Sequence, residues 1–113
     1  MKDYYRSYKD WVNFLGTKTY KKVCHQTNAR LNYNLSIGIS YWNTNLVTIY
    51  PTGNIALNTS GYRTITTKRR LNQLTPPKVI IFQEDYVWYI VDSHRDMIEF
   101  VDGIKINNRG CFI

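Results

Sequence analysis

Hydrophobic and polar residues alternate along much of this chain, and a two-residue period is typical of β-strands with one buried face. The segment LSIGISYW (35–42) places its aliphatic residues and Tyr41 on one side of a strand, with Ser, Gly and Trp42 on the other. LVTIYPTGNIAL (46–57) predicts a hairpin that turns through Pro-Thr-Gly. The first half of the chain is therefore predicted to form antiparallel strands.

The same period continues in the second half of the sequence. The other predicted strands are 17–24, which a polar turn at 26–29 follows, KVIIFQ (78–83), YVWYIV (86–91) and both halves of MIEFVDGIKI (97–106). Glu84-Asp85 separates one adjacent pair of strands. Asp102-Gly103 suits a tight hairpin turn in the last segment.

Two segments follow a helical period instead. Aromatic and aliphatic residues recur at helical spacing from Tyr4 to Leu15, and Gly16 is a suitable stop. A shorter helix is predicted to begin after a strand at 62–66 and to end before Pro76-Pro77. Its Leu residues are spaced to point inward, which leaves Arg69 and Asn72 exposed.

These elements predict an α+β fold: a mainly antiparallel β-sheet of six to eight strands, with an N-terminal helix and a short central helix. The chain has 113 residues, and no linker, repeat or low-complexity tail divides it. A single domain over residues 1–113 is expected. No apolar run reaches the length of a membrane span, so no membrane partner is expected.

The basic residues are unevenly distributed. Residues 1–83 hold twelve Lys or Arg and two acids, whereas residues 84–113 hold three and six. No carboxylate lies between Asp10 and Glu84. Such a positive field attracts phosphates, although a codon bias toward Lys and Asn would produce the same composition. The acidic part is expected to dock on the basic part, within one chain or between chains.

This charge distribution disfavours catalysis. General acid–base chemistry needs a carboxylate or His near the reacting atom, and the middle of the chain offers only His25. No phosphate-binding or hydrolase motif is present. Two Cys and two His do not make a zinc site at these spacings, and Cys24 and Cys111 fit either a disulfide or two thiols. We expect no enzyme activity, metal or cofactor.

The central segment GYRTITTKRRLNQL (61–74) carries the candidate ligand site. Phosphate at the start of a helix meets free N–H groups, and here it would also meet Thr hydroxyls and cations. Thr66 or Thr67 is suited to cap the helix, and Arg63, Lys68 and Arg70 are the candidate cations. The alternative is a solvated surface helix whose Arg and Lys stems cover apolar residues.

Three further residues are candidates outside this segment. Phe82 is able to stack on a base, or it fills the core. Arg109 lies in a Gly-containing turn, and it would matter if a neighbouring subunit brought it to the pocket. Arg30 is a weaker case of the same kind. Solvation is the usual state of an isolated Arg in such a turn.

A resemblance adds to this chemistry. YWNTNLVTIYPTGNIALNTSGYRTITTKRRLNQ (41–73) resembles a pattern of small phage and prophage proteins, in which LNT(G/S)G(W/Y)RT(V/I)TTK follows a Val-rich strand and a Gly turn. The match covers about a third of the chain. Tyr62 stands where Trp is expected, and Ser60 where Gly is expected.

Among phage proteins of this size, the functional analogy is with the Thoeris anti-defence sponges. Those proteins bind cyclic ADP-ribose-type immune signals without cleaving them, as oligomers, and some hold cyclic oligonucleotides. The resemblance therefore implies a counter-defence protein that sequesters a cyclic nucleotide-type signal in the cytoplasm of an infected bacterial host. Cations for pyrophosphate, aromatics for adenine, and Asn and Thr for ribose fit that role.

Two other functions remain open. A basic β-domain with exposed aromatics also suits a single-stranded nucleic-acid-binding module, although no recognition motif for nucleic acid is present. A small phage structural protein would bind no ligand. Whichever function applies, a homo-oligomer is expected, with the aromatic-rich first helix as a candidate interface.

Overall fold

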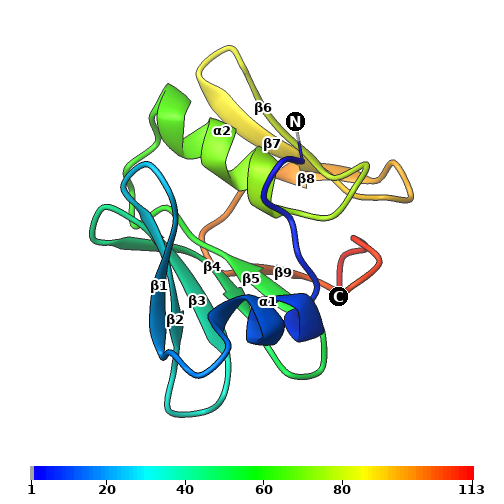
Figure 1. The fold of residues 1–113 in the computed structure, drawn as a ribbon. Coiled ribbons are helices and arrows are strands. Elements are labelled where there is room, and N and C mark those ends of the chain that lie inside the picture. The colour runs from blue at the N-terminus through cyan, green and yellow to red at the C-terminus, as the bar shows by residue number, and fades with distance from the viewer. Residues whose placement is uncertain (1) are drawn as a thin grey trace.

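The computed structural model describes residues 2–113, in which two helices accompany two antiparallel sheets (Figure 1). The larger sheet has the order β1 (Tyr20–Cys24), β2 (Thr27–Leu31), β3 (Ile37–Tyr41), β4 (Thr44–Ile49), β5 (Ile55–Leu57) and β9 (Ile104–Ile106). The smaller sheet has the order β6 (Ile80–Glu84), β7 (Val87–Val91) and β8 (Met97–Glu99). The helices are α1 (Tyr8–Leu15) and α2 (Ile65–Leu74). The expected α+β class is confirmed.

The first five strands of the larger sheet follow one another as hairpins. Ala29 of β2 pairs with Ile39 of β3, which pairs with Val47 of β4, and all three side chains are buried. Their neighbours in sequence point to the opposite face, because successive side chains in a strand alternate. The predicted hairpin at 46–57 is confirmed.

The chain leaves the larger sheet after β5 and returns to it as β9. Between these strands it forms α2 and the whole smaller sheet. The predicted hairpin at 97–106 is therefore wrong: β8 pairs with β7, and β9 pairs with β5. The tight turn at Asp102-Gly103 does form, because the Ile104 N–H donates to the Val101 carbonyl at 3.1 Å, but the strand on each side of it pairs with another strand.

The N-terminal helix is shorter than its aromatic spacing predicts. It begins at Tyr8, because the Ser7 hydroxyl accepts from the Asp10 N–H at 3.2 Å and caps it there. Trp11 and Leu15 are buried, as predicted. Gly16 ends the helix with a φ of 61°, a backbone conformation that favours glycine.

Three local predictions are wrong. Residues 62–64 form no strand, and Thr64, not Thr66 or Thr67, caps α2. Tyr62, Thr64 and Ile65 are β-prone residue types, which is why the segment resembles a strand, and the cap residue Thr64 is itself extended, with a φ of −105°. The polar turn at 26–29 is also misplaced, because β2 already begins at Thr27.

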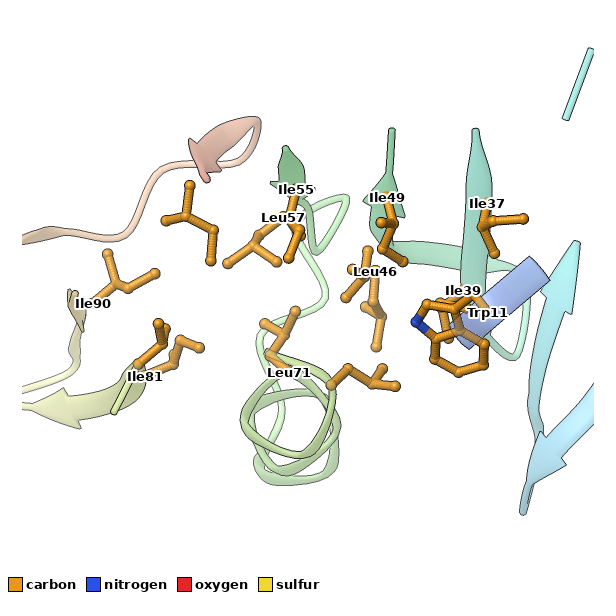
Figure 2. Packing of buried hydrophobic residues seen from close by; sticks show 14 of the residues in the cluster. Trp11, Ile37, Ile39, Leu46, Ile49, Ile55, Leu57, Leu71, Ile81 and Ile90 are labelled. Atoms are coloured by element: carbon orange, nitrogen blue, oxygen red, sulfur yellow. The ribbon is translucent and has the colours of Figure 1, made fainter. Parts of the chain in front are cut away.

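The hydrophobic core lies between the two sheets and continues under α1. Figure 2 shows Leu71 of α2 between Ile81 and Ile90 of the smaller sheet and the side chains of the larger sheet. Trp11 of α1 packs at the far end of this cluster. One continuous core therefore joins both sheets through α2.

Asn72 corrects a further prediction, because it is buried rather than exposed. Its amide oxygen accepts from the Ile81 N–H at 2.9 Å, and its amide nitrogen donates to the Ile81 carbonyl at 2.8 Å. The side chain thus pairs with β6 as a neighbouring strand would. This contact fixes α2 against the edge of the smaller sheet.

Candidate functional site

The N-terminus of α2 opens onto the surface. The Thr64 hydroxyl accepts from the Thr67 N–H at 3.1 Å and lies 3.0 Å from the Thr67 hydroxyl. The N–H groups of Ile65 and Thr66 have no acceptor within the helix, because the first turn lacks preceding carbonyls. This end of the helix therefore carries partial positive charge and free donors.

The start of α2 at Ile65 moves the cations away from that end. Lys68, whose N–H donates to the Thr64 carbonyl at 3.0 Å, begins the second turn. Arg69 and Arg70 follow it. The sequence pattern predicts that these three cations open the helix. In the structure they follow its first turn. Threonines occupy the first turn instead.

A pocket of about 530 Å³ lies between the start of α2 and the turn that joins β3 to β4. We call it the α2 pocket; it is lined by residues 41–44, Tyr62, Thr64, Thr66 and Thr67. Trp42 and Tyr62 are the large aromatic side chains at its mouth, with 61% and 66% of their surface exposed. The pocket thus combines exposed rings with hydroxyls and a helix N-terminus.

Trp42 owes its exposed position to the tight turn between β3 and β4. Its φ is 53°, and its N–H donates to the Gln26 carbonyl at 2.8 Å. A left-handed conformation is uncommon for an aromatic residue. The turn therefore holds the indole away from the core, in contrast to the other two Trp residues, which are buried.

A second hollow of about 340 Å³ adjoins the α2 pocket on the outer face of the larger sheet. We call it the asparagine face; it is lined by Tyr20, Asn28, Arg30, Asn32, Gly38, Ser40, Trp42, Asn43 and Asn45. The Asn45 side chain lies directly over Gly38, because a Cβ there would be 2.7 Å from the Asn45 side-chain oxygen. Both hollows share Trp42 and Asn43, so they adjoin each other.

The loop that carries Tyr62 is held from a distant part of the chain. One carboxylate oxygen of Asp102 accepts from the N–H and the hydroxyl of Thr59, each at 2.8 Å. The other oxygen accepts from the Gly61 N–H at 3.3 Å. Asp102 is therefore the residue that fixes this wall of the pocket.

The predicted site residues are not gathered in one place. Thr66 and Thr67 line the α2 pocket, and Arg30 lies on the asparagine face. Arg63 and Lys68 lie toward the smaller sheet, where each cation is within 6 Å of the Trp88 ring centroid. The Arg63 guanidinium also donates to the Phe100 carbonyl at 3.2 Å.

Arg70 joins α2 to the turn between β1 and β2. Its guanidinium donates to the Thr27 hydroxyl at 3.1 Å, to the Gln73 amide at 2.7 Å and to the His25 carbonyl at 3.4 Å. It also lies 5.7 Å from the ring centroid of Tyr41. Its donors are thus used within the fold, behind the pocket.

Phe82 and Arg109 lie outside both hollows. Phe82 stacks on Tyr89 in the smaller sheet, with ring centroids 5.5 Å apart. The Arg109 carbonyl accepts from the Ser93 hydroxyl, and its N–H donates to the Asn107 amide at 2.9 Å. The turn at Arg109 therefore packs against the loop after β7.

Sequence reasoning missed Trp42, Asn43, Tyr62 and Thr64 as site residues. A signal was present, because strand alternation places Trp42 on the polar face with Ser40. A large aromatic residue next to turn residues on a polar face is a candidate for binding. Tyr62 carries no such signal, since its segment has the pattern of a strand.

Two ionisable groups with shifted pKa values lie elsewhere. Burial lowers the pKa of Lys2 to about 8, and its amine donates to the Thr75 hydroxyl at 2.9 Å. Burial raises the pKa of Asp92, but N–H groups of Phe112, Asp96 and His94 outweigh it and lower the pKa overall. Both groups stabilise chain ends and loops rather than the pocket.

Within residues 2–113, no three His, Cys, Asp or Glu side chains are arranged to hold a metal ion. Cys24 and Cys111 are both free thiols. In the same range, neither helix is long and apolar enough to cross a membrane.

Comparison with known proteins gives one match. The family model described as "Kyanoviridae Gp96 protein" matches residues 6–107. No curated protein and no solved structure matches the chain.

Proposed function

The chain belongs to the Kyanoviridae Gp96 protein family, a family of phage proteins, and from that premise we propose that it binds and sequesters a nucleotide-type immune signal without cleaving it. The observation that carries this proposal is the α2 pocket, which two exposed aromatic side chains line together with the first turn of a helix. A cyclic ADP-ribose isomer or a cyclic oligonucleotide is the proposed class of ligand.

The base of such a ligand stacks on Trp42 or Tyr62. Each ring exposes more than half of its surface in the free protein, so stacking removes apolar area from water. Stacking of a base on an aromatic side chain is worth about 1 to 3 kcal/mol. The two rings approach the pocket from different segments, which suits a ligand with a defined shape.

A phosphate binds at the start of α2. The N–H groups of Ile65 and Thr66 supply donors, and the helix dipole favours negative charge there. Within the described chain, the Thr66 hydroxyl has no hydrogen-bond partner and is available to the ligand. Arg63, Lys68 and Arg70 lie outside the pocket lining, so they contribute long-range charge rather than direct contacts.

The asparagine face extends the site for a larger ligand. Its amides donate and accept hydrogen bonds, which suits ribose hydroxyls, and Arg30 offers a guanidinium for a second phosphate. Volumes of about 530 Å³ and 340 Å³ each fall in or near the range of small-molecule sites. A ligand with two phosphates or two bases would span both hollows across Trp42.

Counter-defence is the role in which such binding serves a phage. A protein that holds a signal intact in the host cytoplasm lowers its free concentration and needs no catalytic group. The residues that line the α2 pocket are Tyr, Trp, Asn and Thr, which stack and hydrogen-bond. This composition suits retention of the ligand.

Binding of single-stranded nucleic acid is the second candidate. Tyr20, Trp42 and Tyr62 are all exposed and lie along the two adjoining hollows, an arrangement that would stack successive bases. Polynucleotide binding would weaken steeply with salt, because many counterions are released. A small ligand in a pocket would depend on salt only weakly.

A thermal-shift panel tests the proposal, with cyclic ADP-ribose isomers, cyclic di- and trinucleotides, linear nucleotides and a short single-stranded DNA. A ligand at a hundredfold its Kd stabilises the native state by about 2.7 kcal/mol, a readily visible shift. A bound ligand is then released by heat and analysed by chromatography. Intact cyclic nucleotide supports sequestration, a cleaved product makes the protein an enzyme, and a shift with DNA alone favours the second candidate.

Matched variants locate the site. Trp42→Ala is expected to raise the Kd about 5- to 150-fold, the equivalent of one lost stacking contact. Thr66→Val removes the hydroxyl at constant shape and is expected to weaken ligands that carry phosphate. Tyr86→Ala is the control, because Tyr86 is 95% exposed in the turn between β6 and β7. Equal binding by Trp42→Ala and wild type would place the site elsewhere.

A further inference from the structure

The smaller sheet has one open face. Paired residues of neighbouring strands share a face. The register forms three rows across the strands on this face: Ile80, Val91 and Met97; Phe82, Tyr89 and Glu99; and Glu84 and Val87. The opposite face carries Ile81, Trp88 and Ile90, which are buried in the core. Residues of the open face therefore point away from the core.

The open face is mostly apolar. Its apolar members are Ile80, Phe82, Val87, Tyr89, Val91 and Met97. In the described chain, none of them belongs to the core cluster or packs against it. Ile80 and Met97 expose 51% and 56% of their surface. Figure 1 shows α2 on one side of β6 and β7. A contiguous exposed apolar face of this kind marks an interaction surface.

Charges of opposite sign lie at the two ends of this face. Lys78 and Arg95 line a hollow of about 250 Å³ together with Ile80, Val91 and the buried Asp92, which places both cations at the first end. Glu84 lies at the other end by the register of the strands, whereas Glu99 lies in the middle row, beside Tyr89. Among residues 2–113, none of the four exposed charged side chains has a hydrogen-bond or ion-pair partner.

We propose that the open face of the smaller sheet binds a second copy of this chain, face to face, about a two-fold axis that lies in the interface and runs across the strands. Such an axis reverses the strand direction of the partner, so the cationic end of each copy lies over the acidic end of the other. Lys78 then approaches Glu84 of the other copy, and the apolar row of Ile80, Val91 and Met97 packs against the middle row of the other copy, which holds Phe82 and Tyr89.

The charge pattern selects this occupant over others. The carboxylates of this face repel nucleic acid and anionic membranes, whereas a second copy matches both ends at once. Face-to-face packing of two sheets, about 10 Å apart, is a common arrangement in proteins. Three short strands bury less than the roughly 800 Å² per partner of a standard interface, so the dimer is weak and needs high protein concentration.

Charge reversal tests the proposal by sedimentation equilibrium. Wild type is expected to rise from 13.4 kDa toward twice that mass as concentration approaches about 1 mM. Glu84→Lys and Lys78→Glu are each expected to stay monomeric, because like charges then meet. An equimolar mixture of the two is expected to dimerise, since each variant complements the other.

Two results would overturn the proposal. One is a wild type that stays at 13.4 kDa throughout the concentration series. The other is self-association of either charge-reversed variant as strong as that of wild type. Ile80→Asp in the otherwise natural chain is the second variant; it is exposed, so it should fold, and it must abolish the dimer. When Ile80→Asp is added to both charge-reversed variants, their equimolar mixture must also fail to dimerise. That result would show that the apolar residues take part in the interface.

Discussion

Replacement of Asn72 by Ala gives the sharpest test of how α2 is held. The substitution removes two buried hydrogen bonds, of 2.9 Å and 2.8 Å, and leaves the N–H and carbonyl of Ile81 without partners. A buried polar group left unsatisfied costs about 1 to 3 kcal/mol, so the two together cost about 2 to 6 kcal/mol. For a domain of this size, about 4 °C is lost per kcal/mol, and Tm should fall by roughly 8 to 24 °C.

Urea denaturation and thermal melting measure this effect. Arg69→Ala is the matched control, because Arg69 is exposed on the same helix, and such a substitution changes stability by about 0.5 kcal/mol or less. If Asn72→Ala lost no more stability than Arg69→Ala, Asn72 would be exposed as its sequence position suggests. The strand-like contact between α2 and β6 would then be refuted.

A second substitution at the same position separates donor from acceptor. Asn72→Asp keeps an oxygen for the Ile81 N–H but places a carboxylate against the Ile81 carbonyl. At neutral pH this variant should be at least as unstable as Asn72→Ala. At acidic pH the protonated carboxyl group is again able to donate, so part of the loss should return, measured relative to wild type at the same pH.

Three further predictions concern loops and turns. Asp102→Ala should lower stability, because the N–H and the hydroxyl of the buried Thr59 each lose their acceptor, at a cost of about 1 to 3 kcal/mol for each group. The substitution should also weaken ligand binding at the α2 pocket. Denaturation measures the first effect and ligand titration the second. Gly110→Ala should be more destabilising than Gly16→Ala. Both glycines have a positive φ, but only at Gly110 would the new Cβ lie 2.4 Å from another side chain. The free energies of unfolding of the two variants compare backbone strain with and without a steric clash. Asp92 should contribute stability above its unfolded pKa near 3.8 that is lost as pH falls through its lower folded pKa, and Asp92→Asn should flatten the acid limb of the stability profile.

The two-residue alternation of the sequence was enough by itself to determine most of the strands. It placed the strands of the hairpin at 46–57 and the pair at 78–91, because one buried face forces side chains to alternate. The positions of Trp11 and Leu71 in the core follow from helical spacing in the same way. The phage origin also followed from a sequence pattern, and the family match agrees with it.

Only the tertiary structure decided which strands pair over long distances and what lines the site. Asp102 holds Thr59 and Gly61 across more than forty positions of sequence, and no local pattern encodes that contact. The same contact, together with the Thr64 cap, converts a strand-like segment into a loop and a helix start. The candidate cations followed from charge alone, yet hydrogen bonds direct Arg63 and Arg70 into the fold. Local periodicity is short-range physics, whereas a pocket forms where distant segments meet, and their contacts determine which side chains face it.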